Sequence, residues 1–150
     1  MLSASIINKT ISEYNDDNIR FIGKYGLYMS GYLTSIKLPR VEMIMDEAFS
    51  NGGLQTADLP MCRFIGNNAF RYTKLTTLIL RSEELCILYS QFSLWDTNIK
   101  NGTGYIYVPR KLVDIYKVYT NWSTFASQFR ALEDYTIDGT ITGELDATKI

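Results

Sequence analysis

The most constraining feature of this sequence is a leucine pattern that recurs every 21 residues. Three six-residue segments begin at Leu33, Leu54 and Leu75, and each has apolar residues at its fourth and sixth positions as well. A proline, Pro39 or Pro60, follows each of the first two segments. Self-similarity at such a period is typical of solenoids, in which each unit stacks on its neighbours. The pattern therefore predicts a repeat solenoid rather than an ordinary β protein with coincidental alternation.

Each unit also carries a second block downstream of the first. Ile44 precedes Ala48 and Phe49, and the next unit repeats this order with Ile65, Ala69 and Phe70. Alternate residues of a strand point to one side, and strands stacked about 4.8 Å apart form a parallel sheet, so we expect a continuous Leu/Ile column. A second column of aromatic rings is expected on the opposite wall, each contributing about 2–3 kcal/mol. Its members are Phe49, Phe70 and Phe92, the last displaced by one residue.

The array is predicted to be capped at both ends. Ile11 and Ile22 lie 22 residues before Leu33 and Ile44, which indicates a degenerate first unit. The strand positions of this unit are polar (Tyr14, Asp16), as in a capping repeat, and Gly26 and Leu27 replace the Ala–Phe pair. At the other end, Ile106, Val108 and Pro109 repeat the order of Ile36, Leu38 and Pro39 and predict a closing strand.

Beyond Pro109 the apolar period becomes helical. One stripe comprises Leu112, Ile115, Tyr116 and Tyr119, and a second comprises Phe125, Phe129 and Leu132, with Ser123 as its expected N-cap. Two short helices are expected to close the solenoid, with Trp122 as a wedge in that cap rather than a platform for a ligand. The tail has Asp138 and Gly139 between two Thr/Ile runs, which predicts a hairpin. We divide the chain into an N-terminal cap and degenerate repeat (1–32), repeats (33–103), a closing strand with helical cap (104–134) and a tail (135–150).

Composition excludes several kinds of chemistry. The chain has no histidine, which rules out Ser–His and Cys–His dyads and histidine-ligated metals. With 15 basic and 16 acidic residues, it gives no electrostatic reason to bind nucleic acid. Cys62 and Cys86 are too far apart in the sequence for a CxxC motif. Two free thiols that face the core are expected, and a disulfide between the two is the alternative. The first residues form no secretory signal and no stretch reaches transmembrane length, so we expect no membrane insertion and no export by a leader of its own.

The repeat and the closing segment together resemble a known family. The pattern of Leu33, Ile36, Leu38 and Pro39 followed by Ile44, Ala48 and Phe49 is similar to the BspA-type leucine-rich repeat, common in bacterial surface proteins and in gut bacteria and their phages. The resemblance covers residues 11–132, and residues 104–128 look like the terminal cap of such arrays. It implies an α/β repeat solenoid with a small parallel sheet. Members are associated with adhesion and recognition without a shared catalytic residue, so function follows only loosely. Their arrays are usually longer than this one.

The outward positions of the predicted sheet form two rows that we regard as the candidate partner-binding face. One row is Lys37, Asp58, Ile79 and Tyr107, and the other is Ser35, Thr56, Thr77 and Tyr105. Lys37 and Asp58 are expected to neutralise each other, a pair worth under about 1 kcal/mol. An exposed Ile79 beside Tyr105 and Tyr107 is suited to contact a sugar or a protein, and equally to form a subunit interface.

No catalytic, metal or cofactor site is predicted. The adjacent carboxylates Asp16–Asp17, Asp46–Glu47 and Glu83–Glu84 are interpreted as solvated turns. The glycines between units lack phosphate-loop spacing. We therefore expect a non-catalytic binding or structural protein, most simply a phage virion component, either a fibre, a tail tip or a head decoration, that contacts a host surface or other virion subunits. The alternative is a bacterial surface adhesin-type domain that binds glycan or protein. A homo-oligomer is expected because small cores gain from association.

Overall fold

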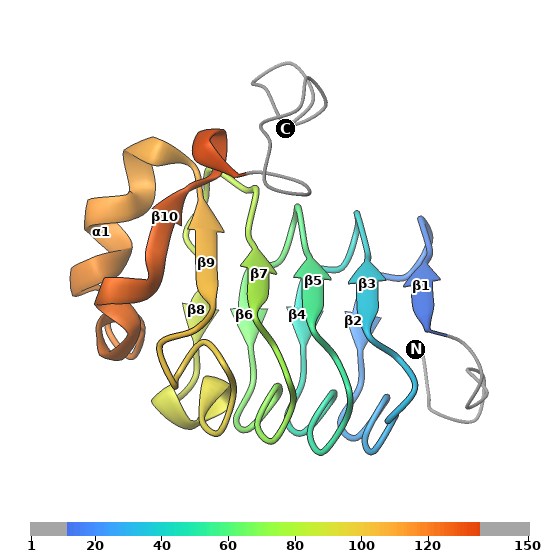
Figure 1. Cartoon of the computed structure of the whole chain (residues 1–150). Coiled ribbons are helices and arrows are strands. Elements are labelled where there is room, and N and C mark those ends of the chain that lie inside the picture. The colour runs from blue at the N-terminus through green and yellow to red at the C-terminus, as the bar shows by residue number, and fades with distance from the viewer. Residues whose placement is uncertain (1–11, 136–150) are drawn as a thin grey trace.

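A computed structural model describes residues 12–135, and every structural statement below concerns that part of the chain. Two parallel sheets lie face to face along a solenoid, with the short sheet behind the long one in Figure 1. The long sheet has the order β1-β3-β5-β7-β9-β10, and the short sheet has the order β2-β4-β6-β8. The long-sheet strands are β1 (Glu13–Asn15), β3 (Ser35–Lys37), β5 (Thr56–Asp58), β7 (Thr77–Ile79), β9 (Tyr105–Val108) and β10 (Phe129–Ala131). The short-sheet strands are β2 (Phe21–Ile22), β4 (Met43–Ile44), β6 (Phe64–Ile65) and β8 (Ile87–Leu88).

The core column predicted from the leucine spacing is confirmed. Ile36 pairs with Ala57, Ala57 with Leu78 and Leu78 with Ile106 in continuous register, and all four side chains are buried. The short sheet faces this column with a column of its own, which comprises Ile22, Ile44, Ile65 and Leu88. Neither sheet can bury its apolar face alone, so the two stabilise each other across one core.

The degenerate first unit lies in register with the complete ones. Tyr14 pairs with Ile36, and the Leu27 amide donates to the Ala48 carbonyl at 2.7 Å, which places Leu27 in the slot that Phe49 occupies one unit later. Tyr14 is only half-buried, and its hydroxyl donates to Asp16 Oδ2 at 2.9 Å. The polar strand position therefore faces the open end of the array, as expected of a capping repeat.

The aromatic column stops one unit earlier than predicted. Phe49 and Phe70 stack with ring centroids 5.4 Å apart, but Phe92 is 41% exposed. The Phe70 amide donates to the Ser93 carbonyl, just as the Phe49 amide donates to Ala69, so the buried Leu94 fills the slot assigned to Phe92. The expectation matched residue type, whereas the third unit has three additional residues between its leucine segment and this slot, which moves the buried position from Phe92 to Leu94.

A third wall joins the short sheet to the next long-sheet strand through tight turns. Each of the first three units places two residues, four positions apart, in the left-handed region, near φ +60°. They are Tyr25 and Met29, Glu47 and Asn51, and Asn68 and Tyr72. Such φ values are uncommon outside glycine and asparagine, so their recurrence indicates that backbone bonds between neighbouring turns hold them. The Glu47 amide, for example, donates to the Asn67 carbonyl at 3.0 Å.

The closing segment contains α1 (Val113–Val118) and three 3-10 helices, η2 (Arg110–Leu112), η3 (Trp122–Gln128) and η4 (Leu132–Asp134), whereas η1 (Gln91–Leu94) lies in the turn of the third unit. Phe129 was expected in a second α-helix but lies in β10, where it pairs with Ile106. Phe129 and Ala131 are buried with Arg130 exposed between them, so the segment alternates like a strand and covers the free edge of β9. The expected N-cap is also wrong, because Asn121 precedes η3 and Ser123 lies inside it.

The edge of the short sheet is covered by side chains of the cap. The Cys86 amide donates to Tyr116 Oη at 2.7 Å, and the Cys86 carbonyl accepts from Trp122 Nε1 at 2.7 Å. Asn121 Nδ2 donates to the Leu88 and Tyr89 carbonyls at 2.8 and 3.1 Å. Trp122 is fully buried and contacts Tyr116 and Phe129, which confirms its expected place as a wedge.

The remaining expectations concern the thiols, the tail and membranes. Cys62 and Cys86 are free and buried, as expected for thiols that face the core, and burial raises the pKa of the Cys86 thiol. The predicted hairpin around Asp138 lies outside the described residues. Within residues 12–135 no helix has the length and apolar character needed to cross a bilayer.

Candidate functional site

The outer face of the long sheet carries the two predicted rows in the expected register. Hydrogen-bonded pairing aligns one row as Lys37, Asp58, Ile79 and Tyr107, and the other as Ser35, Thr56, Thr77 and Tyr105. The structure extends the first row to Asn15 at one end and Arg130 at the other. The face is therefore a rigid array of side chains that belong to consecutive units.

One end of this face carries a group that we call the tyrosine patch, defined as Tyr105, Tyr107, Tyr135 and Arg130. The rings of Tyr105 and Tyr107 meet edge-on with centroids 6.2 Å apart, and Tyr107 lies 4.7 Å from Tyr135. The Arg130 guanidinium stacks over the Tyr105 ring at 4.6 Å. Tyr105 is 37% exposed, so this stacked pair is accessible to a partner. The arrangement presents aromatic faces and a cation side by side.

Local structure explains why these side chains converge. In β9, Ile106 and Val108 point into the core and are fully buried, which turns Tyr105 and Tyr107 outward. Arg130 is fixed by its own element, because its Nη1 donates to the Ser127 and Phe129 carbonyls, each at 2.8 Å. The patch is therefore built on paired strands rather than on a loose loop.

The turn after β10 brings Tyr135 over the face. In η4, Glu133 Oε1 accepts from the Arg110 amide at 3.1 Å, and Asp134 pairs with the Arg110 side chain at 2.7 Å. These contacts direct the chain back from β10 across the sheet. Tyr135 consequently lies above the row that contains Tyr107 and close to Asp58.

Asp58 does not form the predicted pair with Lys37. Arg81 binds it in a bidentate manner, with Nε to Oδ1 and Nη2 to Oδ2 both at 2.9 Å. Both side chains are only 12% exposed, whereas Lys37 is exposed. Cross-strand register favoured Lys37 as the partner of Asp58. The planar guanidinium of Arg81 instead donates two parallel hydrogen bonds to the carboxylate, and a guanidinium pairs with a partly buried carboxylate better than an ammonium group does. Arg81 Nη1 is buried without an acceptor among the described residues.

Ile79 was expected to be exposed beside the tyrosines, but it is only 2% exposed. It lies between Asp58 and Tyr107 in register, and Tyr135 is close to both of these neighbours. Ile79 thus contributes apolar area beneath the patch instead of a contact for a partner.

Burial changes the acidity of two patch tyrosines. Burial first, and then the neighbouring Tyr135 and Tyr105, raise the pKa of the Tyr107 phenol. Burial and the Asp58 carboxylate raise the pKa of Tyr135. Both phenols are therefore neutral at physiological pH and can donate or accept hydrogen bonds with a partner.

The carboxylates elsewhere serve turns and surface pairs. Asp46 Oδ1 accepts from the Asn67 amide at 2.8 Å, and Glu47 Oε1 accepts from Asn68 Nδ2 at 2.9 Å. Asp16 Oδ1 accepts from the Asn18 amide, which lowers the Asp16 pKa. No group of three potential metal ligands occurs in residues 12–135.

Three residues that shape this face, Arg81, Arg130 and Tyr135, were not predicted from the sequence. Arg81 directly follows the last residue of its leucine segment, and Arg130 lies in a strand that the sequence suggested was helical. Tyr135 was assigned to the tail. The alternation of Phe129, Arg130 and Ala131 was the one available signal, because a buried–exposed–buried order also fits an edge strand.

Comparison with known proteins agrees with this architecture. A family model described as "BspA type Leucine rich repeat region" matches residues 6–117 in 6 copies. No curated protein and no solved structure matches the chain. Leucine-rich repeats of this kind generally form non-catalytic binding domains. The match covers well over half of the chain, and the chain therefore belongs to the BspA-type leucine-rich repeat family.

Proposed function

We propose that this protein is a recognition module that binds an acidic protein surface through the outer face of its long sheet. The observation that carries the proposal is the exposed stack of Arg130 on Tyr105, set beside Tyr107 on paired strands. Tyrosine and arginine are among the residues enriched at energetic centres of protein interfaces. Because β9 and β10 already hold these side chains in place, little side-chain entropy is lost on binding.

The charge pattern of the face favours an acidic partner. Arg81 neutralises Asp58, so the cations Lys37 and Arg130 remain at separate points along the same row. The acidic Glu13 lies on β1, at the far end of the array from the patch. A partner that supplies carboxylates opposite Lys37 and Arg130, and an apolar or aromatic group opposite Tyr105, would complement this face.

The biological setting that we favour is a virion, in which the module contacts a host surface or another virion subunit. The alternative is a bacterial cell-surface adhesin-type domain, which would use the same face. Family membership supports recognition and adhesion in either setting. Proteomic analysis of purified phage particles and of cell-envelope fractions from the source culture decides between them.

The binding proposal is tested with one substitution and a matched control. The native protein, Tyr105→Ala and Tyr72→Ala are immobilised and exposed to extracts of the source culture, and bound proteins are identified and titrated. Tyr72 also lies under an arginine, with Arg71 at 4.9 Å, but belongs to the turn wall and is 51% exposed. We expect Tyr105→Ala to weaken the binding free energy by at least about 2 kcal/mol, which corresponds to roughly a 30-fold loss of affinity. Tyr72→Ala should retain native affinity. Equal retention by both variants would reject the placement, and preferential capture of a glycan would reject the partner class.

A further inference from the structure

The outer face of the short sheet carries an exposed apolar row that the recognition face does not use. Phe21, Met43, Phe64 and Ile87 follow one another in register, one from each strand. Phe21 and Ile87 are about half exposed, and the exposed Tyr89 lies edge-on to Phe64 at 6.4 Å. Contiguous apolar side chains on a surface mark interaction sites more often than scattered ones do.

One margin of this row is lined by charges of alternating sign. Their order along the solenoid is Arg20, Glu42, Arg63, Glu84. Arg20 pairs with Glu42 at 3.3 Å, and Arg63 pairs with Glu84 at 2.8 Å. All four side chains are at least one-third exposed, so these pairs contribute little to folding and remain available for other contacts.

The alternation is self-complementary when the order is reversed. A second copy, rotated by 180° about an axis parallel to the strands and lying between β4 and β6, presents the same row in the opposite order. Arg20 then faces Glu84 of the second copy, and Glu42 faces Arg63. The apolar positions meet in the same way, Phe21 opposite Ile87 and Met43 opposite Phe64. A copy stacked with its row in the same order would instead place like charges together, which is unfavourable.

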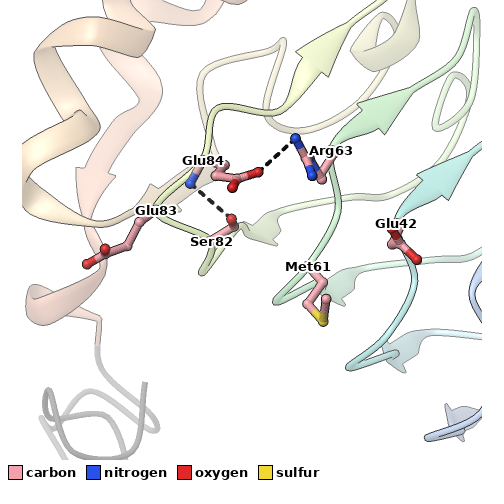
Figure 2. Close-up of a pocket in the computed structure, with 6 residues that line it drawn as sticks. All are labelled: Glu42, Met61, Arg63, Ser82, Glu83 and Glu84. Carbon is pink, nitrogen blue, oxygen red and sulfur yellow. Dashed lines mark hydrogen bonds and ion pairs between the residues drawn. The ribbon is translucent and has the colours of Figure 1, made fainter.

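The surface beside this axis is hollowed. Glu42, Met61 and Arg63 line a cavity of about 330 Å³, together with Ser82, Glu83 and Glu84. Figure 2 shows Arg63 paired with Glu84, and it shows Met61 and Glu42 as neighbouring side chains that line the same pocket. The hollow gives the long Arg63 side chain of a second copy room to reach Glu42.

We propose that the short sheet is a twofold homodimer interface. The row Phe21, Met43, Phe64 and Ile87 of one copy packs against the same row of the second copy in the opposite order. Such an interface is isologous, because the same surface contributes from both copies. Four strands about 4.8 Å apart span roughly 15–20 Å, and each strand is short, so the contact is smaller than a standard stable interface and the dimer is weak. The dimer dissociates in the micromolar range and leaves the tyrosine patch free on the other sheet.

The test is analytical ultracentrifugation of the full chain from about 1 to 500 µM, with far-UV circular dichroism as the check of folding. The native protein should show a concentration-dependent monomer–dimer equilibrium that weakens with added salt. Ile87→Ser should weaken the dimer at least tenfold. Val118→Ser is the matched control, because Val118 is an exposed aliphatic residue on α1, and it should leave the dimer unchanged.

Charge reversal tests the antiparallel order directly. Arg63→Glu should weaken the dimer at least tenfold, because it places carboxylates opposite Glu42 twice in each dimer. The double variant Glu42→Arg, Arg63→Glu has the order plus, plus, minus, minus, which is again complementary when reversed, and should restore association. A native protein that is monomeric up to 500 µM would overturn the proposal. So would failure of the double variant to recover, or a dimer weakened by Tyr105→Ala, which changes only the recognition face.

Discussion

Replacing Trp122 tests how the solenoid is closed. Its side chain is fully buried, contacts Tyr116 and Phe129 at centroid distances of 5.5 and 5.8 Å, and donates from Nε1 to the Cys86 carbonyl at 2.7 Å. Truncation of a buried tryptophan to alanine costs about 3–5 kcal/mol, and a buried carbonyl left without its donor adds about 1–3 kcal/mol before relaxation. The total free energy of unfolding of a folded domain is about 5–15 kcal/mol. We therefore expect Trp122→Ala to lose about 4 kcal/mol or more of unfolding free energy.

The assay is urea unfolding followed by far-UV circular dichroism, so that removal of a fluorophore does not remove the signal. Trp95→Ala is the control, because Trp95 is half-buried and contacts only Phe92 and Lys100 among the ring and cation pairs of the described residues. The Trp95→Ala variant should lose less than about 1.5 kcal/mol of unfolding free energy. Equal losses for the two variants, with unchanged m-values, would refute the view that Trp122 seals the open end of the core.

Three further predictions test the corrected packing, the corrected charge pair and the acidity of a buried phenol. Leu94→Ala should destabilise the fold by about 2–5 kcal/mol in chemical unfolding, whereas Phe92→Ala should cost under about 1 kcal/mol. A larger loss for Phe92→Ala than for Leu94→Ala would instead support a column formed by Phe49, Phe70 and Phe92. Asp58→Ala leaves the partly buried Arg81 guanidinium unpaired and should cost more than about 2 kcal/mol, while Lys37→Ala should be neutral within about 0.5 kcal/mol; equal effects would contradict the observed pair. Burial raises the pKa of Tyr116, so its phenol keeps its proton in the folded chain above pH 10, where the unfolded chain loses it, and unfolding free energy should fall as pH rises from about 10. Tyr116→Phe should flatten that decline, and an unchanged slope would count against the assignment.

The sequence predicts the long-sheet core well because a strand repeat constrains it directly. Leu33, Leu54 and Leu75 fix the period, and a period fixes which residues are neighbours once the strands are parallel. The outward positions of β3, β5 and β7 follow from the same period, and those of β9 follow from the match of Ile106, Val108 and Pro109 to Ile36, Leu38 and Pro39. Only the number of residues between blocks is poorly constrained, and the three additional residues in the third unit made the assignment of Phe92 wrong.

The contacts that sequence reasoning missed involve segments that the period does not relate. Periodicity shows that Ile79 points out of its strand, but not that the turn after β10 brings Tyr135 above the same row. Long side chains such as Arg81 reach beyond the nearest position in register, so the partner of Asp58 could not be chosen from spacing alone. For Phe129, a short apolar run fits a helix or an edge strand equally well.

Site-specific photo-crosslinking tests most directly the central claim that the two sheets present two separate interaction surfaces. Benzoylphenylalanine is placed singly at position 105, at position 87 and, as a control on the turn wall, at position 72, and the full chain is irradiated in its source culture. We predict a crosslink to a different protein from position 105, a crosslinked pair of this chain from position 87, and neither product from position 72. The same products from all three positions, or none from position 105, would contradict the account.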